Sequence, residues 1–442
     1  HRDLHSFPTR RSSDLDTLDD DTLDDDTLDD DTLDDDSGDD DTIDDDTGDD
    51  DTVPIDEYPE IVGSNGLFGN DLFVIRNEGG ELVTPSTYDL YDILSNPERI
   101  INADLNNDDA IDLVITGWHA HGISMLNNGD GTFTVADGFS IILYGGYGLA
   151  AGDFNEDGFA DVVTTGNTYT DDRSEETTYT AALYLGVGDG TFQERVELTI
   201  SGYAYSIVVD DFNEDGHADI VLSSSSAGAN LSLLFGNGDG TFTEETLVTQ
   251  TYGACYMVAA DVNGDLHQDL IKSNCSNDVV TIVTGDGSGG FTEAETISTG
   301  DYPVAVAAGD FTGDATVDIA VINEDDGSLQ IFANDGTKGY SLANEYALPQ
   351  APHHVVTADL DNNAALDLVI SFDLDRSRAV YYGGGDGSFT EGHEYSVGSQ
   401  ATGAAVGDYN GDGLLDVAAI GQNHSDLLSI YLIRLCHGIQ HR

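Results

Sequence analysis

Residues 153–161 read DFNEDGFAD, and this nine-residue pattern decides the fold because it returns along the chain. The copies are DLNNDDAID (104–112), DFNEDGFAD (153–161), DFNEDGHAD (211–219), DVNGDLHQD (261–269), DFTGDATVD (310–318), DLDNNAALD (359–367) and DYNGDGLLD (408–416). Their starts are 49, 58, 50, 49, 49 and 49 residues apart. Seven copies with a period near 50 residues predict a β-propeller or another repeat array.

The surroundings of each copy are also repeated. A stretch of small apolar residues precedes it, a β-rich stretch such as DVVTTG follows, and an alternating run leads to a glycine turn such as NGDGTF at 237–242. This order predicts four strands per unit, with the acidic loop between the first two and the glycine turn between the last two. We therefore expect an all-β, seven-bladed propeller of four-stranded blades. A parallel β-helix is the competing repeat fold, but its coils are normally shorter.

The composition narrows the function. The chain has 442 residues, 86 Asp and Glu against 13 Lys and Arg, and a net charge of −73. Such a chain repels phosphate, which excludes nucleic acid and anionic membranes as electrostatic partners and favours cations. Hydrophobic residues at 39% exclude global disorder. No apolar run of about 18 residues occurs, so no membrane insertion is expected.

The two ends differ from the repeat region. Residues 1–15 are basic and back-translate into a sequence like a sequencing adapter, so we interpret them as a cloning scar, with a genuine basic N-terminus as the alternative. Residues 16–52 hold seven Asp-rich pentads and predict a disordered acidic linker, a solvated spacer or a weak Ca²⁺ buffer. The propeller is expected over 53–433, followed by a doubtful tail over 434–442. No signal peptide is present, which says nothing about export if the native start is missing.

The chemistry of the nine-residue loops follows from their oxygens. Positions 1, 3, 5 and 9 carry Asp or Asn in nearly every copy, so a tight loop would turn these side chains onto one centre. With a backbone carbonyl at position 7 and a final Asp binding through both oxygens, the loop offers the six or seven hard ligands that Ca²⁺ takes. Mg²⁺ fits less well because it demands a strict octahedron. The alternative is an Asx turn that caps a hairpin without metal.

We expect up to seven Ca²⁺ sites, with loops 310–318 and 359–367 the weakest because they depart most from the pattern. Asp109 and Leu266 stand where Gly is expected at position 6, which predicts local strain. The candidate ligands are Asp104, Asn106, Asp108, Asp112, Asp153, Asn155, Asp157, Asp161, Asp211, Asn213, Asp215, Asp219, Asp261, Asn263, Asp265, Asp269, Asp310, Thr312, Asp314, Asp318, Asp359, Asp361, Asn363, Asp367, Asp408, Asn410, Asp412 and Asp416.

The DxNxDGxxD loops and NGDGTF turns resemble FG-GAP/VCBS repeats, which build the integrin-α-like propeller, over roughly residues 70 to 433. The resemblance implies Ca²⁺ in loops on one face and recognition of a glycan or protein on the other. It also implies a secreted or cell-surface protein, which we expect to be bacterial and a monomeric module.

Counting strands exposes a mismatch. Residues 71–84 look like two strands, six full units follow, and the last unit ends after three strands, which gives 29 strands, one more than seven blades of four. We expect Glu81 to Thr84 to close the last blade as its outer strand, with 72–76 spare or competing with 428–433. Alternatively, the parent protein is longer at both ends.

The face opposite the acidic loops is the expected ligand face. It should present the insertion 167–180 and aromatic or polar side chains suited to sugar rings or peptide side chains. Ordinary anchoring of loops is the equal alternative. The candidates are Trp118, Tyr147, Tyr203, Tyr252, Tyr302, His353 and Arg376.

No catalytic motif such as GxSxG or HExxH is visible, so we do not expect an enzyme. His119 and His121 form a possible transition-metal pair, but no third ligand is near in sequence. An adhesion or lectin-like role is therefore predicted. The rival interpretations are a polysaccharide-degrading enzyme on the same scaffold and a structural module of a larger surface protein.

Two of the three cysteines are placed symmetrically about one loop. Cys255 lies six residues before Asp261, and Cys275 lies six residues after Asp269. A symmetric hairpin would put them directly opposite each other, within disulfide range. We expect a Cys255–Cys275 disulfide, with two buried free thiols as the alternative, and Cys436 unpaired.

Overall fold

The computed structural model describes residues 71–434, apart from 79–80, 90–96, 118, 145–147, 169–177, 201–203, 225–230, 248–253, 337–338, 350, 373–376, 397–399 and 423–432. The chain divides into two units, His1–Ser64 and Asn65–Arg442, and every described residue belongs to the second. Strands and connecting loops make up this described part, which contains no helix. Accordingly, no helix within it has the length and apolarity needed to cross a membrane. The predicted scar and acidic linker lie outside the described residues, as does the predicted tail apart from Arg434.

Six successive four-strand groups form the blades. They comprise β3 (Pro97–Ala103), β4 (Asp112–Gly117), β5 (His119–Asn127) and β6 (Phe133–Tyr144); β7 (Leu149–Gly152), β8 (Asp161–Thr168), β9 (Thr178–Tyr184) and β10 (Val196–Thr199); β11 (Ala204–Asp210), β12 (Asp219–Ser224), β13 (Leu231–Gly236) and β14 (Phe242–Leu247); β15 (Tyr256–Ala260), β16 (Asp269–Asn274), β17 (Val279–Gly285) and β18 (Phe291–Ser298); β19 (Pro303–Gly309), β20 (Asp318–Asn323), β21 (Ser328–Asn334) and β22 (Tyr340–Ala347); β23 (Pro352–Ala358), β24 (Asp367–Phe372), β25 (Ser377–Gly383) and β26 (Phe389–Ser396). We number these blades 1 to 6.

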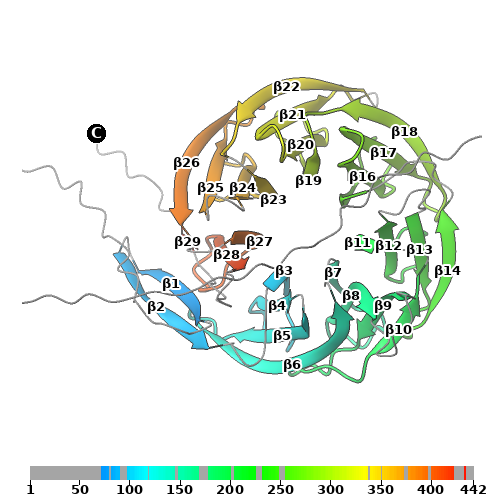
Figure 1. Ribbon diagram of the computed structural model, residues 1–442, viewed down its shortest axis with the longest axis vertical. Coiled ribbons are helices and arrows are strands. Elements are labelled where there is room, and N and C mark those ends of the chain that lie inside the picture. Colours follow the sequence, from blue (N-terminus) through cyan, green and yellow to red (C-terminus); the bar gives the residue numbers. More distant parts are fainter. Residues whose placement is uncertain are drawn as a thin grey trace, which may run out of the picture. The chain divides into compact units, whose positions relative to one another are not determined.

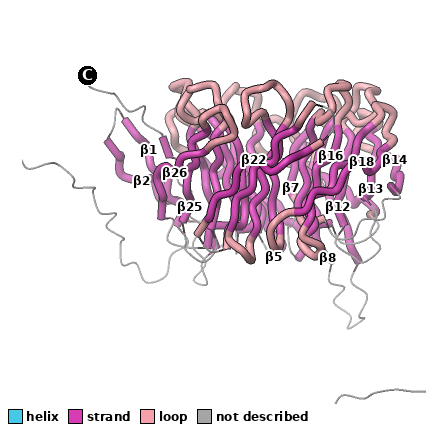
Figure 2. The backbone as a smooth tube through the Cα atoms, turned by 90° about the horizontal axis from the view of Figure 1, so that it is seen from above, coloured by secondary structure: helices cyan, strands magenta, loops and turns pink. Residues whose placement is uncertain are grey.

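Neighbouring strands within each blade are antiparallel, and the blades follow one another around a ring with their first strands innermost (Figure 1). Antiparallel order puts the strand 1–2 loops and the strand 3–4 turns on one rim, which we call the aspartate rim. The other connections lie on the opposite rim, and Figure 2 shows loops at both ends of the strands. Blades 1 and 2 also share one pairing, between Tyr144 and Asn167, which joins their sheets.

The seventh repeat corrects our expectation. Its described strands, β27 (Gln400–Gly407), β28 (Asp416–Gln422) and β29 (Ile433–Arg434), form a three-stranded sheet, so the structure has six four-stranded blades and not seven. The expected outer strand, Glu81 to Thr84, belongs to β2 (Glu81–Asp89), which pairs with β1 (Asp71–Glu78) in a separate hairpin. Only two residues separate β1 from β2, a spacing that favours local pairing over a distant blade. β1 itself lies beside β29.

The core lies between adjacent blades. The second strands, such as β4, β16, β20 and β24, are buried along their whole length because a neighbouring sheet covers each face. One apolar cluster joins Phe154 and Val163 of blade 2 to Ile220 and Leu234 of blade 3. These runs of Val, Ile and Leu therefore form strands that stabilise the ring through contacts between blades rather than within one sheet.

The ring is closed by contacts between the first and last repeats. Thr402 Oγ1 donates to the carbonyl oxygen of Pro97 at 3.0 Å, and Gly131 N donates to that of Tyr409 at 3.2 Å. The rings of Phe133 and Tyr409 pack edge to face with centroids 5.8 Å apart. Blade 1 and the three-stranded sheet are thus neighbours although about 300 residues separate them.

Candidate metal centres

Each nine-residue loop connects the first and second strands of its blade on the aspartate rim, as the repeat predicts. We number loop positions 1 to 9. In loop 153–161, the amide of Asp157 donates to Asp153 Oδ1 and to Asn155 Oδ1, both at 3.1 Å. The amide of Gly158 donates to Asp153 Oδ2 at 2.9 Å. The side-chain oxygens of positions 1 and 3 therefore turn inward over the loop.

The same inward turning occurs in loops 211–219 and 408–416, where position 1 accepts the amides of positions 5 and 6. In loop 359–367, carboxylate oxygens of Asp359, Asp361 and Asp367 all lie within 4.8 Å of one another. Such a set of hard, convergent oxygens fits Ca²⁺ better than a soft transition metal. This loop departs from the sequence pattern at positions 5 and 6, yet it keeps the convergent arrangement.

Loops 261–269 and 310–318 differ from the others at position 3. Asn263 Nδ2 donates to Asp269 Oδ2 at 3.1 Å, and Thr312 Oγ1 donates to Asp318 Oδ2 at 2.9 Å. In both loops the position 3 side chain therefore faces position 9 instead of the amide of position 5. The hydrogen bonds thus group loop 310–318 with loop 261–269 rather than with loop 359–367.

Position 9 has a structural role that the sequence did not reveal. Asp161 is fully buried, and its carboxylate accepts the amide of Phe154 at 2.9 Å and that of Gly186 at 2.7 Å. Gly186 lies just after the third strand, so this carboxylate connects the loop to the end of that strand. Equivalent pairs of bonds are made by Asp112, Asp219, Asp269, Asp318 and Asp367.

Burial raises the pKa of Asp112, Asp161 and Asp219 to about 6, although the amide donors oppose the rise. A carboxylate whose two oxygens each hold an amide has less freedom to bind a cation through both. The sequence suggested that position 9 is a metal ligand that binds through both oxygens. The structure shows that its carboxylate holds the loop to the third strand. The sequence does not show that backbone amides at the end of the third strand donate to position 9, so this role could not be predicted from it.

Two backbone positions in the loops adopt positive φ. Position 6 does so in all seven copies, including Asp109 at 67° and Leu266 at 71°, which the missing glycines predicted. Position 4 does so as well, and there Glu156 and Glu214 both have a φ of 57°. Side chains with a Cβ rarely adopt this region, so both positions carry strain wherever the residue is not glycine.

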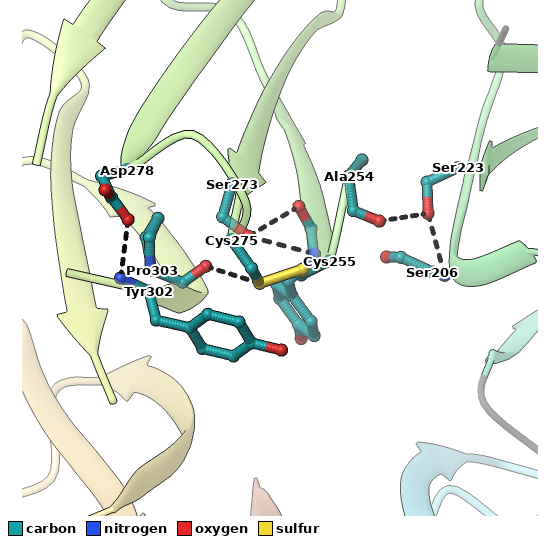
Figure 3. Close-up of a disulfide and its surroundings, with 10 residues drawn as sticks. Ser206, Ser223, Ala254, Cys255, Ser273, Cys275, Asp278, Tyr302 and Pro303 are labelled. Carbon is teal, nitrogen blue, oxygen red and sulfur yellow. Dashed lines mark hydrogen bonds between the residues drawn. A yellow bond between two sulfur atoms is a disulfide. The ribbon is translucent and has the colours of Figure 1, made fainter. Parts of the chain in front are cut away.

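Of the expected ligand residues, Trp118, Tyr147, Tyr203, Tyr252 and Arg376 lie outside the described residues, and Tyr302 and His353 lie within them. Tyr302 is 40% exposed and has a φ of 59°. Its amide donates to Asp278 Oδ1 at 3.0 Å, and its carbonyl oxygen accepts the amide of Glu324 at 2.9 Å. These two bonds fix the backbone from which the ring projects, and Figure 3 shows the one to Asp278.

His353 is part-buried near the start of β23, and its Nδ1 lies 3.2 Å from the carbonyl oxygen of Thr402. Because a carbonyl only accepts, Nδ1 carries the proton. Burial and the Arg99 guanidinium lower the pKa of His353 to about 4, so the ring is neutral at pH 7. Beside it, Tyr256 and His354 pack edge to face, with the Tyr256 hydroxyl 3.3 Å from His354 Nε2. No sequence motif singles out these two residues, although both stand five residues before a loop.

The Cys255–Cys275 disulfide is confirmed, with the two Cα atoms 6.0 Å apart (Figure 3). The expected direct opposition is wrong by one residue, because β15 pairs Tyr256 with Ser273 and Ala260 with Asp269. The hairpin is therefore asymmetric about its loop, and the bridge runs diagonally. Cys275 Sγ also contacts the carbonyl oxygen of Pro303 in the next blade at 3.2 Å.

Comparison with known families identifies the repeats. The FG-GAP-like repeat matches residues 104–164, 211–272, 310–370 and 365–419, and the FG-GAP repeat matches 145–184. The chain belongs to the FG-GAP-like repeat family. No curated protein matches the chain. FG-GAP repeats are typical of extracellular and surface proteins.

Solved structures share the fold of this FG-GAP protein at low sequence identity. BBS1N, crystallised in complex with ARL6DN and soaked with mercury, has a TM-score of 0.56 and 11% identity over 78% of this chain and 94% of its own. A protein from Lactobacillus plantarum has a TM-score of 0.52 and 14% identity over 74% and 90%. A functionally unknown protein from Desulfotomaculum acetoxidans DSM 771 has a TM-score of 0.52 and 12% identity over 78% and 93%. At these identities the likeness shows the fold alone.

Proposed function

We propose that this FG-GAP propeller is an extracellular, calcium-stabilised binding module. Its aspartate rim would hold Ca²⁺, and its opposite rim would recognise a glycan or a protein. The observation that carries the proposal is the inward turning of the oxygens at positions 1 and 3, repeated in loops such as 153–161 and 211–219.

The loop residues would have two different roles in a cation site. Positions 1, 3 and 5 lie at the solvent-facing side of the loop and supply oxygens, while position 9 fixes the loop to strand 3. Bound Ca²⁺ would supply the positive charge that offsets the carboxylates gathered in each loop. Without it, neighbouring carboxylates repel one another, as the contribution of Asp153 and Asp157 to the raised pKa of Asp161 indicates after the larger effect of burial.

Calcium binding is tested by titrating the metal-free chain with Ca²⁺ and with Mg²⁺ while measuring bound metal and the melting temperature. We expect several Ca²⁺ ions per chain and a higher Tm, since each site filled at a hundredfold excess over Kd adds about 2.7 kcal/mol. Mg²⁺ should have a smaller effect. Absence of bound Ca²⁺, together with the same melt in EDTA, would refute this half of the proposal.

Recognition on the opposite rim is supported by Tyr302, an exposed aromatic side chain on a hydrogen-bonded backbone, of the kind that stacks on sugar rings or peptide side chains. A glycan-array screen with the calcium-loaded protein tests it, with Tyr302→Ala as the variant. Ala351 has a φ of 57° in blade 6 and, like Tyr302, precedes a proline that begins the first strand, so alanine fits this backbone. Saturable binding that weakens in the variant supports the proposal, whereas release of a cleaved product would favour an enzyme.

A further inference from the structure

Side chains connect neighbouring aspartate loops in one half of the ring. Glu156 at position 4 of loop 153–161 contacts Nδ1 of His217 at position 7 of the next loop through Oε1. The same positions repeat one blade later, where Glu214 Oε1 lies 2.5 Å from His267 Nδ1. We call these two contacts the loop bridges.

A third contact extends the series toward blade 1. Asn107, at position 4 of loop 104–112, donates from Nδ2 to the carbonyl oxygen of Gly158 at 2.7 Å. The loops of blades 1 to 3 each contact the next loop through their position 4 residue, so the loops of blades 1 to 4 are joined in succession.

The series ends at blade 4. Position 4 is glycine in the loops of blades 4 and 5 and of the seventh repeat, at Gly264, Gly313 and Gly411. Asn362, at position 4 in blade 6, makes no side-chain hydrogen bond to the next loop within the described residues. The loops of blades 1 to 4 are thus linked, whereas the loops of blades 5 and 6 and of the seventh repeat lack a link through position 4.

The backbone at position 4 shows that the glutamates are present for their side chains. Position 4 has a φ between 56° and 76° in all seven loops, a region that favours glycine. Gly264, Gly313 and Gly411 adopt it without strain, whereas Glu156 and Glu214 adopt it at a cost in conformational energy. A glutamate in this position is therefore favoured only if its carboxylate makes a contact that glycine cannot.

The glycine turns are shaped around the bridges. A Cβ added to Gly238 would lie 2.5 Å from His217 Nδ1 and 2.9 Å from Glu156 Oε1. A Cβ added to Gly287 would lie 2.3 Å from His267 Nδ1 and 2.9 Å from Glu214 Oε1. Each bridge thus fits against a turn in which only glycine leaves enough room.

Both ends of a bridge are fastened to candidate ligands. The amide of His217 donates to Asp215 Oδ1 at 3.0 Å, and the amide that follows Glu156, that of Asp157, donates to Asp153 Oδ1 at 3.1 Å. A shift of one loop on closing around a cation therefore moves the histidine or glutamate that holds the next loop. Glycine turns also donate to position 2 carbonyl oxygens, as in Gly240 to Phe154 and Gly387 to Phe311. These bonds occur in both halves of the ring, so they do not distinguish the linked loops from the others.

We propose that Glu156, Glu214 and Asn107 are positioning residues that couple the Ca²⁺ sites of blades 1 to 4, so that these four sites fill cooperatively and the other three fill independently. The inference rests on the proposed calcium binding. Coupling of this kind is a nearest-neighbour effect between repeats, and it typically changes affinity 5- to 150-fold.

The experiment is a calcium titration of the full chain and of the double variant Glu156→Gly, Glu214→Gly, followed by isothermal calorimetry. Wild type should show a cooperative phase with a Hill coefficient above 1. The variant should bind the same number of ions, with a lower Hill coefficient, because only the Asn107 contact between the loops of blades 1 and 2 remains. The midpoint of the cooperative phase should move about fivefold or more to higher Ca²⁺. Its stability in EDTA should be equal or slightly higher, because glycine relieves the strain.

Two further variants separate positioning from a general effect on folding. Asn362→Gly relieves the same left-handed strain at a loop without a bridge, so the Hill coefficient should not change. Glu156→Gln, Glu214→Gln keeps an oxygen that accepts from Nδ1, so it should retain part of the coupling and stands in if the glycine variant fails to fold. Calcium binding with the same Hill coefficient in all variants overturns this inference alone, whereas a wild type that binds no Ca²⁺ overturns the proposed function as well.

Discussion

The hydroxyl of Tyr409 donates to Oδ1 of Asn102 at 2.8 Å, although the two residues are 307 positions apart in the chain. Asn102 Nδ2 in turn donates to the carbonyl oxygen of Val406 at 2.7 Å. Tyr409 is fully buried at position 2 of the last loop, where it meets Phe133 of blade 1. This pair therefore joins the last repeat to the first at the point where a ring of blades must be closed.

Tyr409→Phe is expected to weaken this closure without changing the packing. Phenylalanine already occupies position 2 in three other loops, at Phe154, Phe212 and Phe311, so the ring itself is tolerated. The lost hydrogen bond leaves the Oδ1 atom of the part-buried Asn102 with one partner fewer, which should lower the free energy of unfolding by about 1 kcal/mol. Urea unfolding with an unchanged m-value measures it, and an unchanged midpoint would contradict the closing role.

Asp161→Asn and Asp153→Asn should separate the two roles of loop carboxylates. In Asp161→Asn, one oxygen is replaced by an amide that would face the backbone N–H of Phe154 or Gly186, so the metal-free protein should lose about 2–4 kcal/mol. Asp153 also accepts two backbone amides, but it is part-buried at the loop surface, where water can replace a lost bond. Asp153→Asn should therefore cost the metal-free protein less stability than Asp161→Asn while removing one Ca²⁺. Urea unfolding in EDTA combined with metal counting gives both values. Equal destabilisation by the two variants in EDTA would be inconsistent with these assignments.

The pKa of His353, lowered to about 4 by burial and by Arg99, predicts a pH dependence. In the unfolded chain the pKa of the imidazole is about 6.5. Between about pH 4 and pH 6.5 the native state therefore binds fewer protons than the unfolded state. The contribution to stability is complete above about pH 6.5 and is lost as the pH falls toward 4, up to about 3 kcal/mol. The measurement is urea unfolding of wild type and His353→Gln from pH 7.5 to 4.

The comparison with His353→Gln is needed because other groups titrate in the same window. The buried Asp112, Asp161 and Asp219 have pKa values raised to about 6, and this makes the metal-free fold more stable as the pH falls. The difference between wild type and variant cancels their effect. That difference should shrink below pH 6.5, and parallel curves would rule out His353 as the cause.

The features that the sequence predicts correctly are those that recur within a single repeat. The loops carry their oxygens and glycines at fixed spacing, so their place between the first two strands followed, as did the Cys255–Cys275 bridge. The sequence could not give contacts that depend on tertiary structure. The bond between Asp161 and the amide of Gly186 depends on how the second and third strands of one blade pair, and the contact between Glu156 and His217 depends on how neighbouring blades are placed. The prediction that Glu81 to Thr84 pairs with the last blade was wrong for a related reason. Only two residues connect β2 to β1, so pairing with β1 costs less loop-closure entropy than pairing with a distant sheet edge.

The charge of −73 predicts a dependence on ionic strength. Seven Ca²⁺ ions would offset only about 14 charges, so self-repulsion persists in the calcium-loaded protein. Salt shortens the Debye length from about 10 Å at 0.1 M to about 3 Å at 1 M and should raise the Tm. Scans from low to molar NaCl, at saturating Ca²⁺, measure the effect. A Tm that stays flat or falls would contradict it.

Reduction of the Cys255–Cys275 disulfide should destabilise blade 4. The bond closes a segment with a sequence separation of 20 residues that contains the whole loop 261–269, so its loss frees that hairpin in the unfolded chain. Loop-closure entropy for this length predicts a loss of about 3 kcal/mol. The double variant Cys255→Ser, Cys275→Ser should show the same loss without reductant and no further change with it. Because this term lies in the unfolded chain, it should be similar in saturating Ca²⁺ and in EDTA if both redox forms bind Ca²⁺ equally. Urea unfolding under the four combinations of reductant and Ca²⁺ decides this, and a reduced protein as stable as the oxidised one in EDTA would show that the disulfide does not stabilise the blade.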